Sequence, residues 1–256
     1  LLGILNFELP NEDEERRRAE IEDEIPTEVP TVCKSGDLWQ LGEHRLMCED
    51  STSLEAAQCL MGESFLDMIF TEPPYGVSYE EKTKNIVNQS KTRKTSKIEG
   101  DSISSIDLKT TLVRSFKNQE TFLNKKSSYY VCFPLGAIGG EDLKIINLLE
   151  DSNMICRHII VWAKNAPVFS MGRLDYDYQH EIILYGWSKN RSHNKIMEGD
   201  HKTTVWNINK EKNTDHPTTK PVAIPENAIK NSCPYGGAVG DFFSGSGSTL
   251  IACEKT

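Results

Sequence analysis

The chain has 256 residues, of which 26% are charged and 38% hydrophobic, and its formal net charge is -9. This length can bury the core of one large α/β domain or two small ones. No run of about 18 apolar residues occurs, so we expect neither a membrane span nor a membrane partner. The net charge argues against wholesale non-specific binding to nucleic acid.

The cysteines and histidines are scattered along the chain. None of the seven cysteines forms a CxxC pair, and the six histidines have no paired spacing. This pattern predicts reduced thiols in a cytoplasmic protein, with neither a disulfide framework nor a metal site.

Residues 1–32 are predicted to be an acidic linker or tail, and 33–256 the folded domain. Residues 11–30 carry nine acids and three arginines, which is -6 of the net charge of -9. A charged helix over 11–24 is the alternative to a linker. The start, LLGILNFELP, lacks an initiator Met and the features of a signal peptide, which predicts a fragment of a longer polypeptide. Outside the tail, basic islands such as KTRKTSK (91–97) leave room for local contacts with nucleic acid.

The folded part begins with two short strands around a Gly-Glu turn in DLWQLGEHRLMCED (37–50). A helix over 53–62 follows, capped by Ser51 or Ser53. FLDMIF (65–70) is a continuous apolar run, typical of a strand inside a parallel sheet. Residues 80–105 are polar and are predicted to form a mobile loop. The later predicted elements are a helix at 106–123, a strand at 127–133, a helix at about 140–150, strands at 154–164, 180–187 and 203–208, a helix at 222–232, a strand at 238–243 and a helix opened by a glycine turn at 244–255.

Strands and helices alternate along the chain, without an internal repeat. This alternation predicts an α/β fold in which helices cover both faces of an open, mostly parallel sheet. Ligands of such sheets bind at the carboxyl ends of the strands.

The glycine turn is the first candidate site at such an edge. In VGDFFSGSGSTLIACEK (239–255), Gly245 and Gly247 would let the backbone pass close to a ligand and point free N–H groups at it. A phosphate-binding loop needs Lys before Ser or Thr, and the dinucleotide fingerprint needs a third glycine where Leu250 stands. A cofactor without a pyrophosphate, such as one with an S-adenosyl group, therefore fits better.

The second candidate site is TEPPYG (71–76), at the end of the 65–70 strand. The carboxylate of Glu72 and the backbone carbonyl between Pro73 and Pro74 can both accept hydrogen bonds from an exocyclic amine. The prolines fix the geometry, and Tyr75 offers a flat face for a planar base. A base of a duplex must be flipped out to reach such a pocket. A plain proline turn is the alternative.

Three motifs in this order, TEPPYG, DHPTTKP (215–221) and DFFSGSGSTLIACE (241–254), resemble those of amino-methylating DNA methyltransferases of the permuted (beta) class. The resemblance extends over about residues 36–256. Its segments GDLWQLGEHRLMCEDST (36–52) and FSMGRLDYDYQHEIILYGW (169–187) resemble a phage and prophage branch whose members often carry an upstream partition-protein-like nuclease domain. It implies a Rossmann-like sheet in circularly permuted motif order.

The resemblance also implies a function. The expected activity is methyl transfer from S-adenosyl-L-methionine to the exocyclic amine of adenine in double-stranded DNA, as in restriction–modification. The acidic first position of the catalytic motif favours adenine, whereas Ser there usually goes with cytosine. The expected setting is the cytoplasm of a bacterial or phage-infected cell, and the expected assembly is a homodimer.

Carried over by position, the resemblance assigns roles to individual residues. The catalytic pocket would consist of Glu72, Pro73, Pro74 and Tyr75. The cofactor site would consist of Asp50, Thr71, His216, Thr218, Lys220, Asp241, Phe243, Gly245 and Gly247. A helix cap is the alternative role for Asp50, and a surface charge for Lys220. Candidate DNA contacts, in or near a target-recognition segment at 164–210, are Arg173, Tyr176, Tyr178, Lys189 and Arg191; lid or surface positions are the alternative.

Three features depart from the family pattern. Glu72 stands where the family has Asp, and its extra methylene moves the carboxylate by roughly 1.5 Å. Glu49 replaces a glycine before Asp50, and Phe242 replaces a proline after Asp241. The chain also ends at Thr256, before the strand whose terminal acid would hold the cofactor's ribose, which predicts a truncated C-terminal part. A catalytically inactive DNA-binding protein, a cytosine-amine enzyme and an RNA methyltransferase are therefore the alternatives. A protein glutamine is disfavoured as a substrate because such enzymes have Asn in place of Glu72.

Overall fold

The computed structural model describes residues 32–75, 105–134, 144–168, 175–196, 202–209 and 220–256. Contacts divide the chain into Leu1–Ser35 and Gly36–Thr256, and every described helix and strand belongs to the second unit. The predicted acidic tail and the predicted loop at 80–105 lie outside the described residues, apart from the last residue of each. None of the described helices is long and apolar enough to cross a membrane.

The N-terminal part of this unit is a hairpin followed by a helix. Strands β1 (Leu38–Leu41) and β2 (His44–Met47) pair antiparallel around the predicted Gly-Glu turn. Helix α2 (Leu54–Met61) begins after Ser53, whose hydroxyl accepts the N–H of Ala56 at 3.1 Å. Both predictions are confirmed, and the cap is Ser53 because its oxygen reaches an otherwise unpaired N–H of the first turn.

Six strands form the central sheet, in the order β7-β5-β6-β4-β3-β8. Strand β3 (Leu66–Thr71) runs parallel to β4 (Leu123–Cys132) and to β8 (Val239–Gly240). Strand β5 (Met154–Val168) is parallel to β7 (Val205–Asn207), whereas β6 (Tyr178–Ser188) is antiparallel to both β4 and β5. The predicted α/β fold with a mostly parallel sheet is confirmed, and β6 is the strand that runs against its neighbours.

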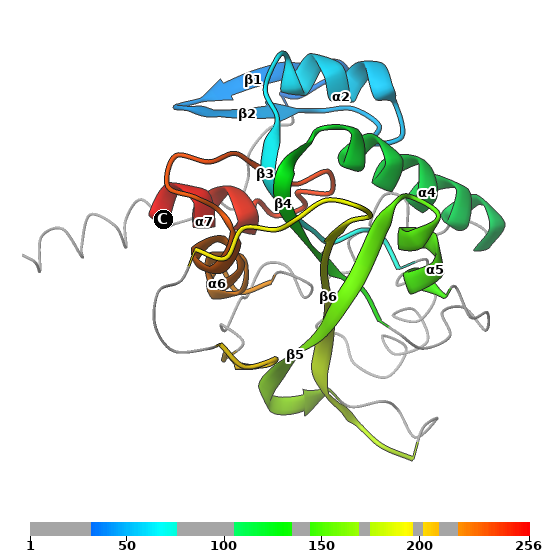
Figure 1. Cartoon of the computed structure of the whole chain (residues 1–256), viewed down its shortest axis with the longest axis vertical. Coiled ribbons are helices and arrows are strands. Elements are labelled where there is room, and N and C mark those ends of the chain that lie inside the picture. The colour runs from blue at the N-terminus through cyan, green and yellow to red at the C-terminus, as the bar shows by residue number, and fades with distance from the viewer. Residues whose placement is uncertain (1–31, 76–104, 135–143, 169–174, 197–201, 210–219) are drawn as a thin grey trace, which may run out of the picture. The chain divides into compact units, whose positions relative to one another are not determined.

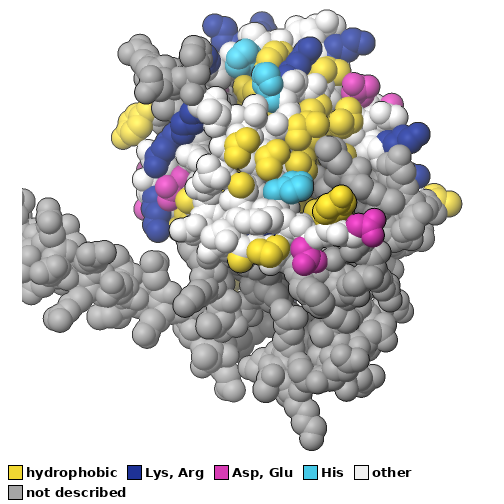
Figure 2. All heavy atoms as spheres, turned by 90° about the horizontal axis from the view of Figure 1, so that it is seen from below, with side chains coloured by type: hydrophobic (Ala, Val, Ile, Leu, Met, Phe, Trp, Pro, Cys, Tyr) yellow, Lys and Arg dark blue, Asp and Glu magenta, His cyan; other side chains and the backbone are white. Residues whose placement is uncertain are grey.

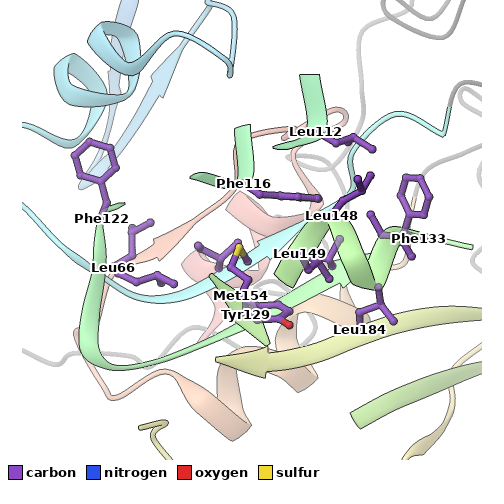
Figure 3. Packing of buried hydrophobic residues seen from close by; sticks show 14 of the residues in the cluster. Leu66, Leu112, Phe116, Phe122, Tyr129, Phe133, Leu148, Leu149, Met154 and Leu184 are labelled. Carbon is purple, nitrogen blue, oxygen red and sulfur yellow. The ribbon is translucent and has the colours of Figure 1, made fainter. Parts of the chain in front are cut away.

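Helices cover both faces of the sheet (Figure 1). On one face, α2, α4 (Ser105–Thr121) and α5 (Ile145–Glu150) contribute to a core that includes Phe116, Leu149 and Tyr129 (Figure 3). On the other face, α6 (Ala223–Ser232) and α7 (Ser248–Lys255) contribute to a second core that includes Tyr130 and Trp162. Tyr129 and Tyr130 belong to different cores because neighbouring residues of a strand point to opposite faces.

Several strand boundaries differ from the predicted ones. Strand β4 begins at Leu123 instead of 127, and β5 continues to Val168. Strand β8 is shorter than the predicted 238–243, because the Asp241 carboxylate accepts the N–H of Phe243 at 3.1 Å and turns the chain away from the sheet. This early turn places the glycine segment directly after the carboxyl end of β8.

Candidate active site

The carboxyl ends of β3, β4 and β8 meet at one edge of the sheet, because the three strands are parallel. Thr71, fully buried, is the last residue of β3, and Glu72 follows it at this edge. The hydroxyl of Thr71 donates to Asp241 Oδ1 at 2.8 Å, joining the end of β3 to the residue after β8. The structure therefore brings together the two motifs that the sequence separates by about 170 positions.

Glu72 Oε1 has two donors inside the protein. The hydroxyl of Tyr75 donates to it at 3.0 Å, and the ammonium group of Lys220 forms an ion pair with the same oxygen. Lys220 is only 6% exposed, so its alternative assignment as a surface charge is wrong. Glu72 and Lys220 are 148 positions apart in the sequence, yet they form one charged centre at the sheet edge.

Two residues that the sequence analysis missed extend this centre. Lys220 Nζ also lies 2.8 Å from Glu181 Oε2, and Lys164 Nζ lies 2.6 Å from Glu181 Oε1. The result is an ion chain of alternating charge, Glu72–Lys220–Glu181–Lys164. A signal was present in HEIILYGW, because Glu181 shares a strand face with Ile183 and Tyr185, and a charge pointing toward a core needs a partner.

Burial and the ion chain shift the pKa values of Lys220 and Glu181 in opposite directions. Burial by itself lowers the pKa of Lys220, but the negative groups around it, including Glu72 and Glu181, raise this pKa well above its usual value. Burial by itself raises the pKa of Glu181, but Lys220 and Lys164 bring it below its usual value. Both shifts favour the ionised forms, so Lys220 and Glu181 are charged at neutral pH.

Tyr75 forms an aromatic wall beside Glu72. Its ring packs edge-on against Phe133, with centroids 5.2 Å apart, and Lys220 Nζ lies 6.0 Å from the Tyr75 centroid. Burial raises the pKa of the Tyr75 hydroxyl well above its usual value, so this hydroxyl stays protonated and can donate. Pro73 is buried, and Pro74 and Tyr75 are half-buried.

Asp241 is committed to contacts within the protein. Besides the hydroxyl of Thr71 and the N–H of Phe243, its carboxylate accepts the hydroxyl of Thr249 at 2.6 Å. Burial raises the pKa of Asp241, while these three hydrogen bonds oppose that rise. Since Thr249 lies in the first turn of α7, the carboxylate fixes the glycine turn between β8 and α7. Asp241 thus positions the turn.

The glycine turn has the backbone that the sequence predicted. Gly245 and Gly247 have φ angles of +50° and +80°, a region that favours glycine. A Cβ at Gly247 would meet no atom within 4 Å, so the backbone there has open space beside it. No side chain caps the start of α7, which leaves its first N–H groups for a ligand or water.

Asp50 lies before α2, in an exposed turn. Its Oδ1 accepts the N–H of Thr52 at 2.8 Å, and its own N–H donates to Glu49 Oε1 at 3.0 Å. The cap of α2 is Ser53, so Asp50 stabilises the turn that leads to the cap.

The candidate DNA contacts are spread over two edges of the sheet. Tyr176 and Tyr178 are exposed near the start of β6, at the edge that carries Glu72. Lys189 and Arg191 follow the end of β6, at the opposite edge, and Arg191 donates to Leu123 O at 2.7 Å and pairs with Glu120. Arg173, His216 and Thr218 lie outside the described residues. Within the part that is described, no group of three His, Cys, Asp or Glu side chains could hold a metal ion.

Comparison with known proteins gives a family and a fold. A family model described as DNA methylase (N6/N4 type) matches residues 66–256. The crystal structure of an M1.HpyAVI–SAM complex is similar, with 19% identity, a TM-score of 0.54, and coverage of 80% of this chain and 84% of that one. A PvuII DNA methyltransferase described as cytosine-N4-specific is 14% identical, with a TM-score of 0.55 and coverage of 77% and 74%. No curated protein matches the chain.

Proposed function

The chain belongs to the DNA methylase family of the N6/N4 type, and we propose that it methylates the exocyclic amine of an adenine flipped out of double-stranded DNA. The observation that carries this proposal is the position of Glu72 and Tyr75 beside the glycine turn, at one edge of the sheet. Here an amine donor, a planar base and a nucleoside-type cofactor can meet. The order of the motifs, with TEPPYG before the glycine turn, supports the permuted class.

The proposed cofactor is S-adenosyl-L-methionine. Its sulfonium would supply an electrophilic methyl group, which leaves sulfur as the amine nitrogen forms the new N–C bond and one amine proton is released to solvent. The residues present fit this group, because Gly247 leaves open space and α7 begins with uncapped N–H groups. Gly245, Gly247 and Phe243 would hold it, and Asp241 would position the turn. Thr71, Asp50, His216 and Thr218 are further proposed members of the cofactor site, on the resemblance of the motifs alone.

The base pocket would orient the target amine. Glu72 accepts an N–H of the amine, and the rigid Pro73–Pro74 segment presents a backbone carbonyl as a second acceptor. Tyr75 provides a half-buried ring for stacking, and its hydroxyl donates to the Glu72 carboxylate. This arrangement acts by positioning and by polarising the amine, without a covalent intermediate with the protein and without a metal ion.

The contacts of Glu72 bear on whether its extra methylene, relative to Asp, slows methyl transfer. A glutamate reaches the Tyr75 hydroxyl and Lys220, and the target amine competes with the Lys220 ammonium for the same carboxylate. Displacement of a reacting group by about 1 Å can cost on the order of 100-fold in rate. We therefore propose that Glu72 lowers the rate of methyl transfer without abolishing cofactor binding.

One experiment tests both the activity and the role of Glu72. The whole chain and its Glu72→Asp variant are incubated with labelled S-adenosylmethionine and mixed-sequence DNA, and the product nucleosides are separated. We expect N6-methyladenine, with a higher rate for Glu72→Asp than for the unchanged chain. Glu72→Gln is the matched control, because it keeps the length and removes the charge, and it should be inactive.

Each other outcome has its own meaning. N4-methylcytosine as the product would replace adenine as the target, as in the cytosine-N4-specific relative. Product on RNA alone would replace the DNA substrate. Cofactor binding and DNA binding without any methylation, in the chain and in Glu72→Asp alike, would favour the inactive DNA-binding protein. A phage-like branch, an upstream nuclease domain and a homodimer are further parts of the proposal that rest on the motifs.

A further inference from the structure

A hollow lies on the same face of the sheet as the ion chain. Its volume is about 300 Å³, at the lower end of the range of small-ligand sites, about 300–1,000 Å³. We call it the aromatic–basic groove, and its rim and wall include His158, Tyr185, Trp187, His193, Lys195 and Lys202. These residues come from β5, β6 and the segments after β6 and before β7.

Strand pairing places the groove and the ion chain on one face. His158 pairs with Tyr185, and Trp162 with Glu181, so alternate residues of β5 and β6 line this face from one end to the other. Tyr185 is four residues from Glu181 along β6, which corresponds to about 13 Å. The groove is therefore within a few nucleotides' reach of the proposed base pocket.

Flat rings form the floor and one wall of the groove. Tyr185 and Trp206 are almost buried beneath it. The rings of Trp187 and His193 stack with centroids 4.1 Å apart and planes 20° apart, and His158 stacks on Tyr185 at 6.0 Å. Parallel rings of this kind make a platform on which a further flat ring, such as a nucleobase, can pack.

Cations crowd the rim of the groove. After burial, the neighbours that lower the pKa of His193 are His158 and Lys195, and the neighbour that lowers the pKa of Lys202 is Lys230. Lys195 and Lys230 are thus cationic neighbours of these two groups. Figure 2 shows histidine and hydrophobic side chains together on one face, with Lys and Arg side chains around them and some Asp and Glu side chains at its margins. The lysines at the rim make the groove locally basic in a chain of net charge -9, and a basic surface favours an anionic ligand.

We propose that the aromatic–basic groove binds one nucleotide of a DNA strand, a few nucleotides from the strand's target base. The base packs against the Trp206 and Tyr185 floor and the stacked rings of Trp187 and His193, and its phosphate is bound by Lys195 and Lys202. Threonine hydroxyls and the amide of Asn231 line the groove as further hydrogen-bonding groups. The identity of the polymer rests on the proposed function, whereas the chemistry of a flat ring joined to a phosphate rests on the groove itself.

The test is binding of a fluorescently labelled 12-mer of oligodeoxythymidylate to the whole chain, measured by anisotropy at several salt concentrations. We expect Lys195→Glu and Lys202→Glu each to weaken binding at least tenfold. Each should also reduce the steepness of the plot of log binding constant against log salt concentration by about 1–2. Lys117→Glu is the matched control, because it makes the same change on an exposed position of α4, on the other face of the sheet, and it should change binding less than twofold.

A second readout reports the ring contacts. Bound strand should quench the tryptophan fluorescence, and Trp187→Leu should reduce both the quenching and the affinity while the melting temperature stays within a few degrees. If the Lys195 and Lys202 variants bind like the unchanged chain, or if Lys117→Glu weakens binding equally, the inference is wrong. If thymidine monophosphate competes with the same affinity as the 12-mer, the groove binds free nucleotides, and the proposal that it binds a DNA strand is wrong.

The result is separable from that of the proposed function. Strand binding through the groove without methyl transfer would support the groove and leave the enzyme proposal unsupported. Methyl transfer with unaltered strand binding in all three groove variants would leave the enzyme proposal intact and refute the groove.

Discussion

Replacing Glu181 by Gln tests whether the ion chain is a single energetic unit. The substitution keeps the size of the side chain and removes the one negative charge between Lys164 and Lys220, which lie 2.6 Å and 2.8 Å from its two oxygens. Lys220, which is 6% exposed, then retains Glu72 as its only anionic partner among the described residues. A hydrogen bond to a charged group contributes about 1.5–3 kcal/mol. The single oxygen of glutamine can accept from only one of the two lysines, so one such interaction is lost and we expect a loss of about 1.5–3 kcal/mol.

This loss is large enough to measure as a melting temperature. For a chain of this size, 1 kcal/mol corresponds to roughly 2–4 °C, so Glu181→Gln should lower the melting temperature by roughly 3–12 °C at pH 7. Thermal unfolding followed by circular dichroism gives the value. Glu254→Gln is the control, because Glu254 pairs with His44 at 2.9 Å while its side chain is 78% exposed, and such pairs contribute about 0–1 kcal/mol. If Glu181→Gln lowers the melting temperature no more than Glu254→Gln, the ion chain does not stabilise the fold and the reasoning fails.

Two further predictions concern pH and packing. The folded-state pKa of Glu181 is held below its unfolded value by Lys220 and Lys164, against the opposing effect of burial. Its charge therefore stabilises the fold above the unfolded pKa of about 4.3, and this contribution is lost as the pH falls through the folded pKa. The difference in melting temperature between the unchanged chain and Glu181→Gln should accordingly shrink below about pH 4; a constant difference would contradict this sign. Gly186→Ala should lower the free energy of urea unfolding by more than about 3 kcal/mol, because the new Cβ would lie 2.0 Å from Ile155 O. Gly42→Ala, where no atom lies within 4 Å and only the positive φ of +58° opposes a side chain, should cost about 1 kcal/mol.

Local patterns in the sequence were sufficient to predict most helices and strands and to single out TEPPYG and the glycine turn as candidate sites. The apolar run before Glu72 predicted β3, and the glycines at 245 and 247 predicted a turn that opens a helix. A serine cap at 51 or 53 and the Gly42–Glu43 turn were also predictable, because each depends on contacts within a few residues; the structure selects Ser53. TEPPYG and the glycine turn could be related to each other through the general rule that ligands bind at the carboxyl ends of parallel strands.

The tertiary structure alone decided which charges meet. Glu181 and Lys164 belong to neighbouring antiparallel strands, so their pairing depends on the register of β5 and β6, in which a shift by one residue would turn Glu181 to the other face. Lys220 contacts Glu181 from a segment that follows β7 in the sequence. No short-range pattern in TTKP predicts that its ammonium group is buried. The same holds for the aromatic–basic groove, whose rings lie on separate strands and segments. A sequence pattern reports the preferences of neighbours along the chain, whereas an ion pair or a stacked ring depends on atoms that only the folded sheet brings within a few ångströms.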